Sequence, residues 1–420
     1  MTQENQKKYD EKEKRIKDAI ALKEPDRVPI SPPVELYPVL HAGYTVAEVL
    51  YDTTLEKIKH AVIKYLNDFD PDTSWGLSFI LAGEGPGMEL SKMKTMRWAG
   101  MPGDIIDKNS LHQFIEYPLL LDDEFDEFFT DRTGWTLRKG LPRQSELAEH
   151  FANFHIEPAW SNIAIRQLAT MLSTPEAKAM IQNLWKIEEF YQAFYARAAE
   201  FDKAIIEMGF PLPIGGLATV PFDDYSDTLR GTVDSLMDLH DRPKEVEKYI
   251  EEKLEVVLAA IKATKGQNEG KHVFMPLHKG MDGYMSAEQY RKYYWNHLQK
   301  IILAIIDSGK VPYIYTEGKY NTRLDCLSEV PPGKVFYHFE DVDMALAKKK
   351  LGGIACISGG FLVSMLDWST PQRVREEVKR LLDACAPGGG YVFETSCGIE
   401  YAKRENVEAM FETVREFGKY

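Results

Sequence analysis

The sequence has few cysteines and no long apolar run. Its four cysteines, at positions 326, 356, 385 and 397 of 420 residues, are too few for a disulfide framework. We interpret them as thiols of a reducing compartment, with one or more available as a metal ligand. No stretch reaches the roughly 18 apolar residues of a membrane-spanning helix. The charged segment 1–17 also lacks the apolar centre of a secretory signal, so we expect a cytoplasmic protein.

Positive charge is also scarce. Lys and Arg total 51 against 65 Asp and Glu, which gives a formal charge of −14. A nucleic-acid-binding surface needs a basic face, and docking on an anionic membrane needs a basic patch. We therefore expect neither nucleic acid nor a membrane as a partner.

Phosphate-binding loops and common hydrolase motifs are missing as well. The glycine-rich segments IGGL, SGG and PGGG contain no G-x-G-x-x-G and precede no GKS or GKT. They predict tight turns instead of nucleotide sites. Neither G-x-S-x-G nor H-E-x-x-H occurs. The sequence therefore carries no compact catalytic motif of these kinds.

The chain does contain a regular alternation of short apolar runs and amphipathic helices. Strands are predicted near residues 28, 72 and 210 and at 272–277, 311–315, 335–339, 353–358 and 391–395. Long helices are predicted at about 176–208, on both sides of Pro243, and at about 286–308. Eight strands alternating with helices predict an α/β fold, a (β/α)8 TIM-type barrel with parallel strands.

One barrel domain is predicted over residues 1–420. Residues 1–20 are expected to form an N-terminal helical extension, and residues 85–205 a helical and loop embellishment inserted before the third strand. The second strand candidate is DTSWGLSF, residues 72–79. No internal repeat or low-complexity linker divides the chain.

The carboxyl ends of the strands indicate where chemistry could occur, because active sites of such barrels lie there. Cys397 follows the eighth strand beside a glycine, Glu317 follows the fifth and His278 the fourth. Together they predict a zinc site with three ligands and one open position. Cys356 or His338 could replace one of the three. The alternative is structural, with each Cys a small buried apolar side chain and each His a satisfied polar one.

Several segments resemble the uroporphyrinogen decarboxylase superfamily. They are EPDRVPI near the N-terminus and, in the C-terminal half, HFEDVDMALAKKKLGGIACISGG, STPQRVREEVKRLLDACAPGGGYVFETSCGI and ENVEAMFETVREF. The likeness covers about residues 20–70 and 205–420, and the stretch 85–205 is more individual. The resemblance implies a barrel, in agreement with the strand count.

The superfamily contains two chemistries. True uroporphyrinogen decarboxylases bind a polycarboxylated porphyrinogen through an arginine-rich motif after the first strand, whereas residues 31–44 here, SPPVELYPVLHAGY, contain no Arg. The sequence is closer to the second branch, zinc-dependent methyltransferases that work with corrinoid proteins. This branch includes coenzyme M methyltransferases and components of O-demethylases.

The two motifs of the coenzyme M enzymes are only partly matched. Their His-x-Cys-Gly motif has Tyr315 here in place of His and Glu317 in place of Cys, whereas the late Cys-Gly motif is intact at Cys397. A glutamate ligand would leave zinc a harder Lewis acid, which suits polarising an ether oxygen.

The resemblance therefore implies a zinc-assisted methyltransferase. It would move a methyl group from a small O-methylated, preferably methoxyaromatic, substrate to a corrinoid supplied by a partner protein. Glu317, Cys397 and His278 would hold the zinc, and Tyr315 or His338 would donate a proton or hydrogen bond to the leaving oxygen. The alternatives are a metal-free site with Glu317 as general acid, a decarboxylase, and a non-catalytic ligand-binding barrel.

Overall fold

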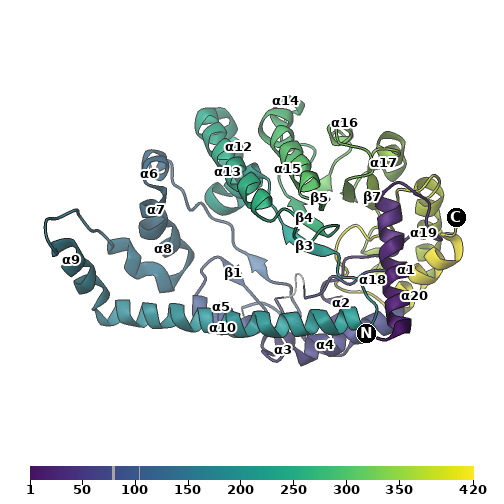
Figure 1. Cartoon of the computed structure of the whole chain (residues 1–420), viewed down its shortest axis with the longest axis horizontal. Helices are drawn as coiled ribbons and strands as arrows, with labels where there is room; N and C mark the ends of the chain where they lie inside the picture. The colour runs from purple at the N-terminus through teal and green to yellow at the C-terminus, as the bar shows by residue number, and fades with distance from the viewer. Residues whose placement is uncertain (78–80, 104) are drawn as a thin grey trace.

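The computed structural model describes residues 1–77, 81–103 and 105–420. A parallel sheet with the strand order β3-β4-β5-β6-β7 lies at the centre of the molecule (Figure 1). Its strands are β3 (Ile214–Leu217), β4 (His272–Leu277), β5 (Val311–Lys319), β6 (Phe336–Asp341) and β7 (Cys356–Gly359). Five predicted strands are thereby confirmed.

The other three predicted strands are short segments that close the sheet into a ring. Parallel bridges join β7 to the eighth strand and the eighth to the first: Ile357–Tyr391, Phe361–Thr395, Ile30–Phe393 and Val34–Ile399. The N–H of Asp72 donates to the carbonyl of Ile30 at 2.7 Å. The N–H of Ser74 donates to the carbonyl of Pro211, just before β3, at 2.9 Å. The predicted (β/α)8 barrel is therefore confirmed; residues 78–79 of its second strand lie outside the described residues.

Helices surround this ring (Figure 1). The longer ones are α4 (Glu56–Phe69), α12 (Gly231–Asp241), α13 (Pro243–Ala263), α15 (Asn296–Asp307), α17 (Met344–Leu351), α19 (Pro371–Cys385) and α20 (Arg404–Phe417). Short ones are α2 (Tyr37–His41), α3 (Val46–Leu50), α11 (Pro221–Asp224), α14 (Ala287–Gln289), α16 (Leu324–Leu327) and α18 (Met365–Trp368). Pro243 begins α13, because proline needs no hydrogen-bond acceptor in the first turn. The predicted break there is confirmed.

Helix α1 (Gln3–Ile20) covers the N-terminal ends of the strands. Its buried residues Ile16, Ala19 and Ile20 belong to one apolar cluster with Tyr313 and Phe336 from the barrel interior. The N-terminal helix therefore closes the end of the barrel opposite to the carboxyl ends of the strands.

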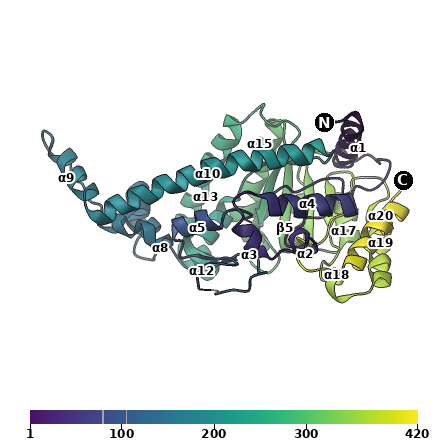
Figure 2. The ribbon, with the colours of Figure 1, turned by 90° about the horizontal axis from the view of Figure 1, so that it is seen from below.

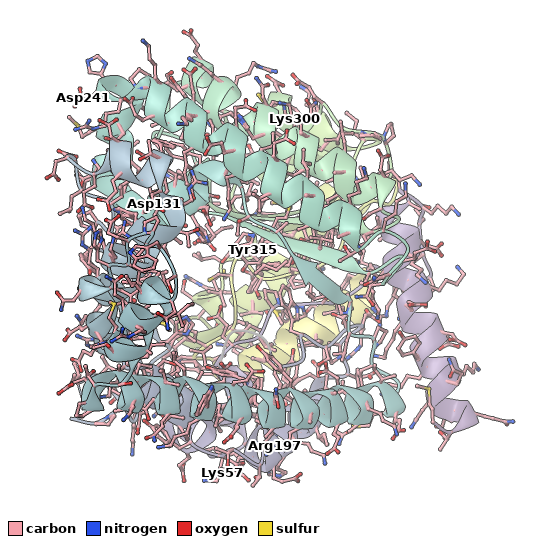
Figure 3. The ribbon with its side chains drawn as sticks, turned by 60° about the vertical axis from the view of Figure 1, so that its left-hand side comes forward. Lys57, Asp131, Arg197, Asp241, Lys300 and Tyr315 are labelled. Atoms are coloured by element: carbon pink, nitrogen blue, oxygen red, sulfur yellow. The ribbon has the colours of Figure 1, made fainter. Side chains whose placement is uncertain are left out.

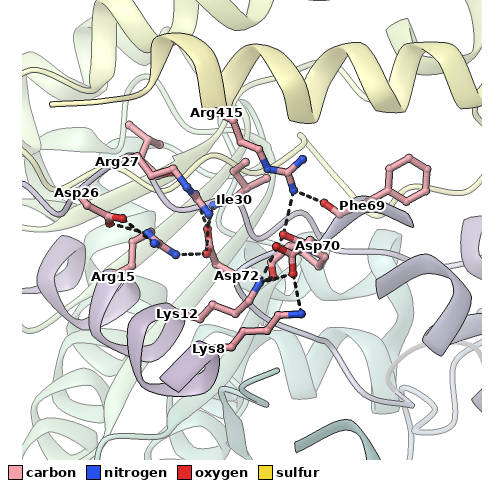
Figure 4. A network of polar contacts seen from close by, with 12 residues as sticks. Lys8, Lys12, Arg15, Asp26, Arg27, Ile30, Phe69, Asp70, Asp72 and Arg415 are labelled. Atoms are coloured by element: carbon pink, nitrogen blue, oxygen red, sulfur yellow. Dashed lines mark hydrogen bonds and ion pairs between the residues drawn. The ribbon is translucent and has the colours of Figure 1, made fainter. Parts of the chain in front are cut away.

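A buried ionic network ties α1 to the first two strands (Figure 4). The carboxylate of Asp72 is fully buried and lies 2.5 Å from Arg15 of α1 and 2.7 Å from Arg27. It also accepts the N–H of Ile30 at 2.7 Å. Two cations and a backbone donor thus compensate the desolvated charge, as a buried carboxylate requires.

The region between the second and third strands is mainly helical and projects from the barrel (Figures 1 and 2). Its elements are α5 (Gly85–Ser91), β1 (Met96–Arg97), β2 (Gln113–Phe114), α6 (Phe125–Thr130), α7 (Arg132–Trp135), α8 (Leu141–Gln144), α9 (Ile163–Leu172) and α10 (Pro175–Glu207). The side chain of Thr174 caps α10 by accepting the N–H of Ala177, and Pro175 follows it. None of the described helices is both long and apolar enough to cross a membrane.

Candidate active site at the barrel mouth

Three predicted site residues lie at the carboxyl-terminal mouth of the barrel. His278 directly follows β4, Glu317 is near the end of β5, and Cys397 follows the eighth strand. The Nε2 atom of His278 lies 3.6 Å from Oε1 of Glu317. The fold therefore brings the predicted His and Glu face to face from adjacent strands.

Asp227 orients His278 from the helical segment Tyr225–Arg230 that follows α11. Its Oδ2 lies 2.5 Å from Nδ1 of His278, and its Oδ1 lies 3.0 Å from Nζ of Lys279. Burial disfavours the imidazolium, but the hydrogen bond to Asp227 and the nearby carboxylates outweigh burial and raise the pKa of His278 to about 9. His278 is therefore charged at neutral pH, and a metal would have to displace its Nε2 proton.

Asp223 lies beneath this pair and is fully buried. It accepts the N–H groups of His278 at 3.2 Å and Lys279 at 2.9 Å, and the hydroxyl of Tyr294 at 2.6 Å. Burial raises the pKa of Asp223 to about 6. This carboxylate fixes the turn after β4 and so places His278.

Glu317 points into the open part of the mouth. Its side chain is 48% exposed. Desolvation by the surrounding protein nevertheless raises its pKa. The negative charges of Glu340 and Asp227 raise it further, and the positive charge of His278 lowers it. The next residue, Gly318, has a φ of +78° and approaches Met281 so closely that a Cβ would overlap its sulfur. The glycine therefore permits the bend that turns Glu317 toward His278.

The thiol of Cys397 is an unusually weak acid. Burial raises its pKa to about 11, with further contributions from the negative charges of Glu340, Glu35 and Glu400. The thiol is thus protonated at neutral pH unless a cation binds beside it.

Glu35 is a mouth residue that the sequence interpretation missed. Burial, together with the charges of Glu400 and Glu317, raises its pKa to about 7. A Cβ on Gly398 would overlap the Glu35 carboxyl, so the glycine after Cys397 makes room for it. Glu35 is the only acidic residue in segment 31–44, at the end of the first strand, and that position could have revealed it.

The donor atoms fit a zinc ion in part. In a tetrahedral site with bonds of about 2.1 Å, ligand atoms are about 3.4 Å apart. The 3.6 Å separation of His278 and Glu317 is close to that value. However, no three His, Cys, Asp or Glu side chains within the described ranges are grouped closely enough to hold a metal. Cys397 is therefore at the same mouth but not assembled with the pair.

The remaining predicted residues lie deeper. Figure 3 shows Tyr315 in the interior, whereas the other labelled residues are nearer the outside. His338 is fully buried, with Nδ1 2.8 Å from Glu394 and Nε2 3.0 Å from the carbonyl oxygen of Ser396. Cys356 is also fully buried, and burial raises its pKa well above its ordinary value. Neither His338 nor Cys356 reaches the His278–Glu317 pair from these positions.

The family model described as Uroporphyrinogen decarboxylase (URO-D) matches residues 178–417, more than half of the chain. The chain belongs to the URO-D family. The resemblance drawn from its segments is thereby confirmed.

URO-D relatives match only part of the chain. The uroporphyrinogen decarboxylase of Shewanella frigidimarina is 29% identical over 144 residues, which are 33% of this chain and 40% of that protein. The enzyme of Pseudomonas fluorescens is 25% identical over 183 residues, 42% of this chain and 50% of its own length. Both matches span less than two thirds of the relative.

A solved structure shares the whole fold. A methyltransferase from Methanosarcina mazei superposes with a TM-score of 0.57 over 97% of this chain and 98% of its own, at 14% sequence identity. At this identity the likeness shows the fold and not the activity.

The charge of this URO-D mouth does not suit a polyanionic ligand. The cations His278 and Lys279 both contact Asp227, and the segment after the first strand contains no Arg. Glu35, Glu317 and the other carboxylates described above make the surroundings acidic. Binding several substrate carboxylates requires cationic donors, and these two cations are already paired with a carboxylate of the protein.

Proposed function

We propose that this URO-D-family chain is a methyltransferase. It would move a methyl group from a small O-methylated donor, preferably a methoxyaromatic, to a corrinoid carried by a partner protein. The observation that carries the proposal is the His278–Glu317 pair, 3.6 Å apart at the mouth of the barrel with Cys397 at the same end. The acidic mouth disfavours the alternative, decarboxylation of a polycarboxylated porphyrinogen.

Tyr315 supports the departure of the leaving oxygen in this proposal. The electron pair of the broken methyl–oxygen bond would stay on the oxygen, and a reduced corrinoid, as the methyl acceptor, would supply the pair for the new bond. Burial raises the pKa of Tyr315 well above its ordinary value, so its hydroxyl stays protonated and can donate to the developing phenoxide. His338, whose ring nitrogens are both occupied, is less suited to that donation.

A bound zinc ion would supply Lewis acidity toward the ether oxygen. His278, Glu317 and Cys397 are the residues proposed to hold it, and Cys397 would have to move toward the other two. Because His278 and the thiol are protonated without metal, loading would release protons and would weaken as the pH falls.

Two measurements test the proposal. Purified protein, reconstituted with zinc, is expected to hold about one zinc per chain, lost in Glu317→Ala and Cys397→Ala. Cys326→Ala is the matched control, since Cys326 is also partly exposed but lies on α16. With zinc established, methoxyaromatics and a reduced corrinoid protein are assayed for the demethylated phenol.

Each outcome bears on a different part of the proposal, the zinc site or the methyltransferase activity. A reconstituted wild type without zinc contradicts the metal site and favours Glu317 as a metal-free general acid. Zinc binding without demethylation by any supplied corrinoid partner contradicts the methyltransferase. Release of carbon dioxide from a carboxylated substrate would establish the decarboxylase alternative, and ligand binding without turnover the non-catalytic barrel.

A further inference from the structure

Beneath the mouth, three side chains converge on one carboxylate oxygen inside the barrel. Glu394 is 1% exposed and belongs to the eighth strand. Its Oε2 lies 2.9 Å from the Tyr313 hydroxyl, 2.6 Å from Ser358 Oγ and 2.8 Å from His338 Nδ1. Such a group is desolvated, so its charge depends on these partners.

The partners indicate where the protons lie. The carbonyl oxygen of Ser396 can only accept, so His338 Nε2, 3.0 Å away, carries a hydrogen. The hydroxyls of Tyr313 and Ser358 donate to Oε2 of Glu394, and this favours the ionised carboxylate. A carboxylate accepts the third hydrogen bond from a protonated Nδ1. Each ring nitrogen of His338 thus faces an acceptor, the arrangement that an imidazolium paired with Glu394 requires.

His338 also contacts Ser396 and Tyr315. Its Nε2 donates to the carbonyl oxygen of Ser396, the residue immediately before Cys397. Its ring lies flat on the ring of Tyr315, with centroids 3.9 Å apart. A positively charged ring is attracted to the face of an aromatic ring, so the ion pair strengthens this stack.

We propose that His338 is a positioning residue, a buried imidazolium fixed by Glu394 that holds the turn carrying Cys397 and orients Tyr315. Its importance for methyl transfer rests on the proposed function, whereas its protonation and its hold on the turn do not. This role differs from donation to the leaving oxygen, because His338 acts only through Ser396 and Tyr315.

The first test is the protonation of His338 in the wild-type protein. Nitrogen-15 NMR of histidine side chains at neutral pH is expected to show hydrogens on both ring nitrogens of His338, with the signal assigned by its loss in His338→Gln. A signal with one unprotonated nitrogen would overturn the ion pair. The variant serves only to assign the signal, and the hydrogens on the two ring nitrogens are observed in the wild-type protein.

The second test is the reactivity of Cys397 in metal-free protein. In His338→Gln the turn loses this hydrogen bond and the side chain of Cys397 becomes more accessible, so we expect its alkylation to be on the order of tenfold faster. Tyr313→Phe is the matched control, because it removes one hydrogen bond to Glu394 but leaves the contacts of His338 with Glu394, Ser396 and Tyr315 in place. Equal rates in wild type and His338→Gln would overturn the positioning role.

A kinetic measurement distinguishes this positioning role from the proposed methyltransferase function. In the demethylation assay His338→Gln is expected to lower kcat on the order of tenfold with little change in KM, as misplacement of reacting groups does. An unchanged kcat overturns the role in catalysis. Wild type without turnover, but with the expected NMR and alkylation results, overturns the methyltransferase and leaves the hold on Cys397 established.

Discussion

The imidazole of His338 and the phenol of Tyr315 are stacked almost in parallel, with ring centroids 3.9 Å apart and planes inclined by 3°. The stack joins two neighbouring strands, β6 and β5, just below the mouth of the barrel. It orients the Tyr315 hydroxyl while the His338 nitrogens bind other groups. Ring packing and hydroxyl chemistry can therefore be separated by substitution.

Tyr315→Phe keeps the stacked ring and removes the hydroxyl. We expect kcat for demethylation to fall on the order of a hundredfold, because a positioned proton or hydrogen-bond donor contributes roughly that much. The free energy of unfolding should change by about 1 kcal/mol or less, as for a single hydrogen bond. Tyr313→Phe, measured beside it by the same assay and by denaturant unfolding, should retain more activity. Equal activity of Tyr315→Phe and wild type would contradict the donor role.

Alkylation of Cys397 should be slow at neutral pH and strongly pH-dependent. Because burial and three nearby carboxylates raise its pKa to about 11, the thiolate fraction should grow about tenfold per pH unit below that value. Iodoacetamide labelling of metal-free protein, quantified for the peptide containing residue 397, measures this rate. Added zinc should suppress it. A rate that levels off near pH 8 would show that the thiol is not perturbed in this way.

Stability of the metal-free protein should depend on His278 at alkaline pH. Its pKa is raised from 6.5 in the unfolded chain to about 9 in the fold, so the folded state binds the proton more tightly. The resulting stabilisation is complete below pH 6.5 and is lost as the pH rises through 9. Urea unfolding across this range should show the loss in wild type and a weaker one in Asp227→Asn. The same slope in both proteins would assign the effect to other groups.

Asp72 should be far more important for stability than its neighbour Asp26. Asp72→Ala leaves Arg15 and Arg27 without their buried partner, which typically costs about 3–5 kcal/mol. Asp26 pairs with the same Arg15 but is mostly exposed, so Asp26→Ala should cost about 1 kcal/mol or less. Denaturant unfolding of both variants compares them. Similar losses would show that burial does not set the strength of this network.

Local patterns in the sequence were sufficient to predict the barrel. Apolar runs and amphipathic helices alternate along the chain, and Pro243 marks a helix boundary. Such signals depend on residues close together in the chain, so they can be recognised without knowledge of the tertiary structure. The rule that barrel sites lie at the carboxyl ends of strands then placed His278, Glu317 and Cys397 at one mouth.

The partners of these residues could not be predicted in the same way. Asp227 reaches His278 from the helical segment Tyr225–Arg230, Glu35 of the first strand approaches Gly398, and Glu394 of the eighth strand meets His338 of β6. These contacts join residues that are 51, 363 and 56 positions apart.

The sequence by itself therefore determined the barrel, its family and the side chains placed at its mouth, because strand periodicity and strand ends are local properties. Only the tertiary structure decided which of those side chains face each other, which are buried, and what charge each carries. Closure of the barrel sets the distances between these side chains. Desolvation and Coulomb interactions both depend on distance through space and not on distance along the chain.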